Sequence, residues 1–130
     1  MPTVLLKYKG TEECQRVALE LIPKIPGIVA PLMNIEGREL HDGGVGEDEI
    51  MVEPWQFSPF ALNVKDIRIV VEAHNYPERI RLADNAAYSI TEQVRDFIIR
   101  FKNVTPIDLG VSVEPRCMGY TTTIIPGHVG

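Results

Sequence analysis

The sequence predicts an α+β domain in which a strand–helix–strand unit occurs twice, giving a four-stranded mixed sheet with two helices on one face. Residues 3–9 and 66–74 have strand patterns, and apolar residues at helical spacing follow each of them. A further strand pattern follows each helix. Because a right-handed crossover joins parallel strands, we expect parallel pairing within each unit. The units cover about residues 2–57 and 66–118 of a single domain, residues 1–130.

The composition bounds the class of protein. The chain has 130 residues, of which 45% are hydrophobic and 24% charged, which suits one domain with a real core. Its formal net charge of -5 is opposite in sign to that of a typical nucleic-acid binder, so no nucleic-acid partner is expected. No apolar run is long enough to cross a bilayer, so no membrane partner is expected. Two cysteines, Cys14 and Cys117, and no leader pattern indicate reduced thiols in a cytoplasmic protein.

The first unit begins with residues 3–9 (TVLLKYK), a strand that ends at Gly10. Thr11 is a helix N-cap, and acidic residues follow it in the first turn. The apolar stripe of this helix comprises Cys14, Val17, Ala18, Leu21 and Ile22. Pro23 ends or kinks the helix, and the apolar residues that continue to Leu32 predict a second, broken helical piece.

Residues 35–48 contain four glycines and few apolar residues, which predicts an exposed loop. Residues 49–57 (EIMVEPWQF) form the next predicted strand. Pro54 favours an edge position for it, since proline donates no ladder hydrogen bond. The aromatic residues Trp55, Phe57 and Phe60 favour packing in the core or between subunits, with the wall of a ligand pocket as the alternative.

The second unit begins with the clearest strand, residues 66–74 (DIRIVVEAH). Ile67, Ile69, Val71 and Ala73 alternate with Arg68, Val70 and Glu72, so one face meets a core. A helix runs from Pro77 to about Phe101 along a stripe of Ile80, Ala83, Ala87, Ile90, Val94, Phe97, Ile98 and Phe101. Residues 109–114 form the last strand of the unit, and TTTII in the segment 119–130 has the composition of a short edge strand.

Pro2 is the residue most suited to chemistry. A methionine before a small residue is normally removed, which exposes the secondary amine of proline directly at the first strand. Desolvation or a nearby cation lowers the pKa of an amine from the ordinary α-amino value of about 8. An uncharged Pro2 nitrogen is then a general base, or a nucleophile toward carbonyl groups.

A proline-first strand, a capped helix and a strand, followed by a second strand–helix–strand unit within 130 residues, resemble the tautomerase superfamily. This superfamily includes 4-oxalocrotonate tautomerase, 5-carboxymethyl-2-hydroxymuconate isomerase and macrophage migration inhibitory factor. The resemblance covers nearly the whole chain as architecture, and Pro2 is its residue-specific element. It implies a homotrimer, no cofactor, and a keto-enol or allylic proton transfer on a small 2-oxo or enol acid with Pro2 as general base.

The resemblance also implies groups that hold the substrate. Arg38, in the connection between first helix and second strand, is the candidate clamp for a carboxylate ligand, ahead of Lys24. His74 at the end of the third strand is a candidate donor to an enolate oxygen. Arg116, which the last strand would bring toward a neighbouring subunit's site, is another candidate carboxylate clamp.

Two alternatives remain. One is a non-catalytic ligand-binding or assembly protein with the same fold, which is favoured by the acidic residues 47–49 and by the absence of tyrosine and asparagine donors from the last strand. The other is an unrelated ferredoxin-like regulatory module, with different strand pairing and no role for Pro2. The histidines lack metal-ligand spacing, so no metal site is predicted.

Overall fold

The structure is a computed structural model. It describes residues 2–33, 46–74, 77–101, 106–116 and 125–127, with the backbone alone for 74, 77–81 and 115–116. The elements are β1 (Thr3–Tyr8), α1 (Glu12–Leu21), η1 (Ile22–Lys24), α2 (Ile25–Met33), η3 (Glu47–Glu49), β2 (Met51–Gln56), β3 (Ile67–His74), α3 (Pro77–Ile99) and β4 (Leu109–Arg116). Most of the predicted loop 35–48 lies outside the described residues. The predicted strand TTTII also lies outside them, except for its last residue.

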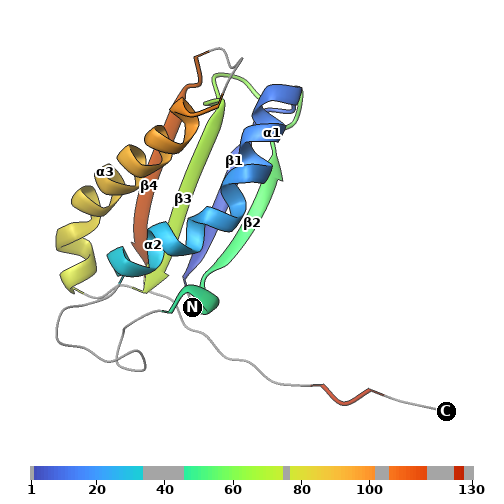
Figure 1. The fold of residues 1–130 in the computed structure, drawn as a ribbon. Helices are drawn as coiled ribbons and strands as arrows, with labels where there is room; N and C mark the ends of the chain where they lie inside the picture. Colours follow the sequence, from blue (N-terminus) through green and yellow to red (C-terminus); the bar gives the residue numbers. More distant parts are fainter. Residues whose placement is uncertain (1, 34–45, 75–76, 102–105, 117–124, 128–130) are drawn as a thin grey trace.

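The four strands form one mixed sheet in the order β2-β1-β3-β4. β1 is parallel to β2, β3 is parallel to β4, and the central pair β1–β3 is antiparallel. The helices cover one face of this sheet (Figure 1). The predicted fold class and the parallel pairing within each unit are therefore confirmed, and β2 is an edge strand as Pro54 predicts.

Local sequence signals set the limits of α1. The Oγ1 of Thr11 accepts a hydrogen bond from the backbone N–H of Cys14 at 3.2 Å, which caps the first turn. Residues one helical turn apart are buried against the sheet: Cys14, Val17, Ala18 and Leu21. Cys14 is thus a buried small apolar residue.

The predicted break after α1 is also confirmed. A single 3-10 turn contains Pro23, and α2 then begins at Ile25 with Pro31 inside it. Pro31 lies near the end of α2, so its missing N–H removes one hydrogen bond close to the terminus. Four apolar residues of α2 are buried: Ile25, Val29, Ala30 and Met33.

The predicted start of the second strand was wrong, because residues 47–49 form a turn and β2 begins at Met51. The N–H of Glu49 donates to the carbonyl of Gly46 at 3.1 Å. The Glu49 carboxylate in turn accepts from the N–H of Gly46 at 3.2 Å. These two bonds close the turn locally, and an acidic run preceding an apolar strand gives no sign of them.

The third strand places its alternate residues as predicted, since Ile67, Ile69, Val71 and Ala73 are fully buried under the helices. Val70 belongs to the opposite face and is also buried, with 4% of its surface exposed. Its register partners on the two neighbouring strands are Leu5 and Ser112. The face of the sheet away from the helices therefore has an apolar centre.

Helix α3 packs on the sheet through Ala86, Ile90 and Val94. Ala86 lies outside the stripe predicted from the sequence, which placed alanines 83 and 87 there. The regular helix ends at Ile99, and a final turn follows in which the N–H of Phe101 donates to the carbonyl of Ile98 at 3.0 Å.

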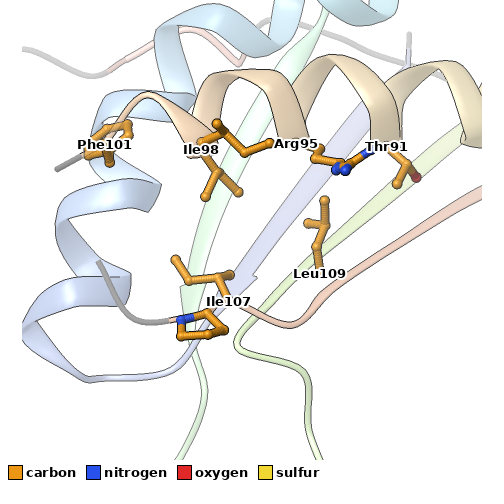
Figure 2. A pocket seen from close by; sticks show the side chains of 8 residues that line it. Thr91, Arg95, Ile98, Phe101, Ile107 and Leu109 are labelled. Carbon is orange, nitrogen blue, oxygen red and sulfur yellow. The ribbon is translucent and has the colours of Figure 1, made fainter. Parts of the chain in front are cut away.

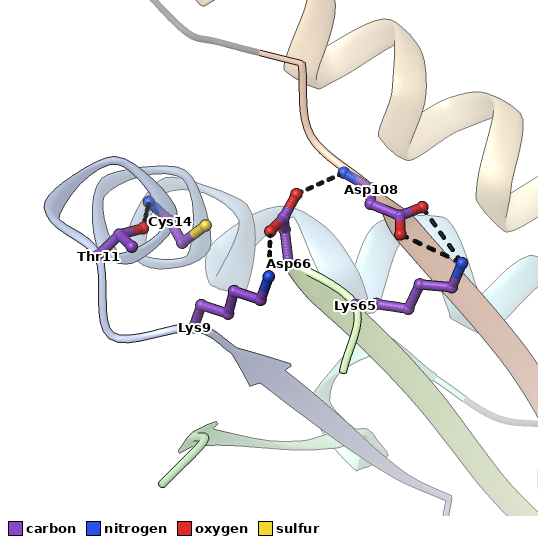
Figure 3. A network of polar contacts seen from close by, with 6 residues as sticks. All are labelled: Lys9, Thr11, Cys14, Lys65, Asp66 and Asp108. Atoms are coloured by element: carbon purple, nitrogen blue, oxygen red, sulfur yellow. Dashed lines mark hydrogen bonds and ion pairs between the residues drawn. The ribbon is translucent and has the colours of Figure 1, made fainter. Parts of the chain in front are cut away.

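A polar network joins β1, β3 and β4 at one end of the sheet (Figure 3). Asp66, just before β3, accepts a hydrogen bond from the N–H of Asp108 at 2.8 Å and pairs with the ammonium of Lys9 at 3.0 Å. Asp108 pairs with Lys65 at 3.2 Å. The Asp108 N–H, and secondarily Lys9, lower the pKa of the Asp66 carboxyl below its ordinary value. Asp66 thus connects the beginnings of β3 and β4 to the end of β1.

The aromatic residues of the β2 region are not core residues of the single chain. Trp55 is 56% exposed and Phe60 is 88% exposed, while Phe57 is half-buried. Packing between subunits remains a prediction for them.

Among the described helices, none has the length and apolar character needed to cross a membrane.

Candidate functional site

Pro2 lies at the start of the central strand β1 and is buried. Its carbonyl accepts a hydrogen bond from the N–H of Met51, the first residue of β2, at 3.2 Å. Pro2 shares its phase along the strand with Val4 and Leu6, which are fully buried under the helices. The proline is therefore held by the sheet in an environment with little access to water.

The strand register brings the predicted site residues toward Pro2. Thr3 pairs with Glu72 in the antiparallel β1–β3 ladder, so the next step along β1 places Pro2 beside the end of β3. His74, the last residue of β3, pairs with Arg116, the last residue of β4. Pro2, His74 and Arg116 thus belong to the same end of the sheet, although they are far apart in the sequence.

Pro2 and the other two residues stand at positions that belong to opposite faces of the sheet. Pro2 has the phase of the helix-facing positions, whereas His74 and Arg116 have the opposite phase in their strands. A ligand that contacts all three would have to lie over the ends of the strands. The side chains of His74 and Arg116, and Arg38 as a whole, lie outside the described residues.

Carboxylates are concentrated at this end of the sheet. Glu72 and Glu114 are register partners across β3 and β4, two positions before His74 and Arg116. Glu47 and Asp48 are exposed just ahead of β2. An anionic ligand here would meet repulsion unless cationic side chains compensate for it.

The cross-strand pair of glutamates was not predicted from the sequence. Each residue stands two positions from the end of its strand, and the pairing follows from the β3–β4 register, which the pattern within either strand does not show. Within the described ranges, no group of three or more His, Cys, Asp or Glu side chains is arranged to hold a metal ion.

Comparison with solved structures identifies the architecture. A 5-carboxymethyl-2-hydroxymuconate isomerase from Deinococcus radiodurans is similar over 98% of this chain and 90% of its own, with a TM-score of 0.53 and 15% sequence identity. The chain has a tautomerase-like fold. A domain of unknown function (DUF1904) from Sebaldella termitidis is also similar, with a TM-score of 0.49 and 17% identity over 95% of this chain and 98% of that chain. No protein-family model matches the sequence, and neither does any curated protein.

Proposed function

We propose that the protein is a tautomerase or isomerase that transfers a proton within a small 2-oxo or enol acid, with the amine of Pro2 as general base. The observation that carries the proposal is the burial of Pro2 at the start of the central strand in a tautomerase-like fold. The proposal requires that Pro2 is the amino terminus of the mature chain.

Burial supports a base at this position because desolvation disfavours the charged form of an amine. A neutral secondary amine at neutral pH accepts a proton from one position of the substrate. The resulting ammonium returns that proton to another position, so that the product is an isomer of the substrate. The sheet hydrogen bond to Met51 fixes the Pro2 backbone while this happens.

Cationic residues would offset the carboxylates around the site. Arg116 is proposed to hold the substrate carboxylate, and its place at the end of β4 supports this role. His74, its register partner, is proposed to donate to the developing enolate oxygen. Arg38 is the other residue that we propose to bind the substrate carboxylate.

We further propose a homotrimer in which the sheet face without helices is covered by other subunits. This face includes the buried Val70, and at β2 it carries Met51 and Trp55, which are 47% and 56% exposed. Glu53 lies between Met51 and Trp55 on this face, so the apolar surface is not continuous, and the two large exposed apolar side chains are what supports an interaction site here. Light scattering should give three times the chain mass of 14.6 kDa.

The activity is tested in two steps. Intact-mass measurement first establishes whether Met1 is removed, since a retained Met1 blocks the amine. The ketonisation of phenylpyruvate and of 2-hydroxymuconate is then followed by absorbance for wild type and for Pro2→Ala. The loss of a positioned base should lower the rate by about 100-fold. Pro59→Ala, which changes an exposed proline in the β2–β3 connection, is the matched control. Equal rates for wild type and Pro2→Ala would refute the role of Pro2.

A second candidate, a ligand-binding or assembly protein without catalysis, is favoured by the carboxylates at this end of the sheet. The paired Glu72 and Glu114 and the exposed Glu47 and Asp48 oppose an acidic substrate. A trimer that has lost Met1 but is inactive toward both substrates would support this candidate.

A further inference from the structure

A cavity of about 400 Å³ lies between α3 and the start of β4, at the opposite edge of the sheet from β2 (Figure 2). Thr91, Arg95 and Ile98 follow one another at intervals of four and three residues, so one face of α3 forms one wall. Ile107 and Leu109 form the facing wall. The volume is within the usual range of small-molecule sites, roughly 300 to 1,000 Å³.

The lining is apolar at one end. Phe101 packs edge-on against Phe97, with ring centroids 5.3 Å apart, and both rings are partly buried against the core, so these contacts restrain the Phe101 ring. Ile99 lines the cavity and remains 65% exposed. Exposed aliphatic surface beside a fixed aromatic ring suits an apolar ligand group more than it suits water.

A single cationic group lies among the described lining residues, the guanidinium of Arg95 (Figure 2). Its partner is Glu92 at 3.7 Å, and the two side chains are 63% and 41% exposed. Such a solvated pair contributes little and holds the guanidinium weakly. The Arg95 side chain can thus turn toward an anion at the polar end of the cavity, and the planar guanidinium binds a carboxylate through two hydrogen bonds.

We propose that this α3–β4 cavity binds a small amphipathic carboxylate, with its apolar part against Ile98, Phe101 and Ile107 and its carboxylate on Arg95. This site is separate from Pro2, which lies beside the far end of β3, whereas the cavity adjoins the start of β4. Binding here therefore does not depend on the proposed catalytic function.

The test uses 4-phenylbutanoate and its neutral analogue 4-phenylbutanamide as probes, with calorimetry for affinity and amide chemical-shift mapping for location. The carboxylate should bind and shift the amide signals of 91–101 and 106–109. Loss of a charged hydrogen bond costs about tenfold in affinity. Arg95→Gln should therefore weaken carboxylate binding by about this factor, and the amide should be similarly weaker in wild type.

Two further variants guard the result against misfolding. Arg100→Gln changes an exposed arginine in the turn that directly follows α3. This residue does not line the cavity, so the variant should leave the affinity unchanged. Ile99→Asn polarises an exposed lining position and should weaken both probes. Equal affinity of wild type and Arg95→Gln for the carboxylate, or equal binding of carboxylate and amide, would overturn the proposal. So would shifts confined to the Pro2 end of the sheet. Pro2→Ala should bind the carboxylate as wild type does, so activity and cavity binding can fail independently.

Discussion

Replacement of Asp66 should destabilise the fold more than replacement of any other residue of the Lys9–Asp66–Asp108–Lys65 network. Its carboxylate accepts from the Asp108 N–H at 2.8 Å and pairs with Lys9 at 3.0 Å, while only 23% of the side chain is exposed. A hydrogen bond to a charged group contributes about 1.5 to 3 kcal/mol, and a partly exposed ion pair adds about 0.5 kcal/mol. We therefore expect Asp66→Ala to lower the free energy of unfolding by about 2 kcal/mol.

Three companion variants separate the two interactions. Asp66→Asn keeps an oxygen that can accept from the Asp108 N–H but loses the charge, so it should cost about 1 kcal/mol. Lys9→Met removes only the ion pair and should cost about 0.5 kcal/mol. Lys65→Met breaks a pair whose side chains are 49% and 62% exposed, and it is the control with almost no effect.

The effect of Asp66 should also depend on pH. Because its pKa in the folded state is below the ordinary value of 3.8, the folded protein binds the proton less readily than the unfolded chain does. The stabilisation is thus complete well above pH 4 and is lost as the pH falls through the folded-state pKa. The stability difference between wild type and Asp66→Asn should shrink from pH 7 to pH 3.

The assay is urea unfolding followed by circular dichroism at one fixed protein concentration, since assembly would add to the apparent stability. In a thermal scan, Asp66→Ala should lower Tm by about 8 °C. A cost of Asp66→Ala below about 0.5 kcal/mol at pH 7 would refute the importance of the network. A difference between wild type and Asp66→Asn that stays constant down to pH 2.5 would refute the assigned role of the charge.

Two pairs of substitutions test the packing and the helix cap. Leu21→Ala removes a fully buried side chain and should cost about 3 kcal/mol in urea unfolding. Leu19→Ala, on the same helix but 67% exposed, should cost less than about 0.5 kcal/mol, and equal costs would contradict the assigned core. Thr11→Ala loses the cap bond to Cys14 and should cost about 1 kcal/mol, whereas Thr11→Ser should retain most of it. If the serine variant is as unstable as the alanine variant, the hydroxyl is not the cap.

The elements that sequence reasoning predicts well are those set by neighbouring residues. Thr11 and Pro23 define the limits of α1 because a cap and a missing N–H act within one turn. The alternation from Ile67 to Ala73 identifies the buried face of β3 for the same reason. The start of β2 was missed because the Gly46 N–H donates to the Glu49 carboxylate and closes a turn there, and the composition of the segment does not reveal this bond.

The candidate site depends on contacts between segments that are distant in the sequence, and such contacts are harder to predict from the sequence than local structure is. The sequence identifies Pro2 by its chemistry. The approach of Pro2 to the end of β3 follows only from the pairing of Thr3 with Glu72. The burial of Val70 and the pairing of Glu72 with Glu114 likewise require the register between strands that are far apart in the sequence. Periodicity within one strand contains no information about that register.

The most direct test of the central claim is the pH dependence with which the Pro2 amine reacts with a small electrophile, measured by peptide mass spectrometry. The ordinary α-amino group has a pKa of about 7.7 to 8.0. A buried, uncharged Pro2 predicts a rate that reaches half its maximum clearly below this range. Half-maximal reaction at or above pH 8, or a chain that retains Met1 and does not react, would contradict the role of Pro2 as the base.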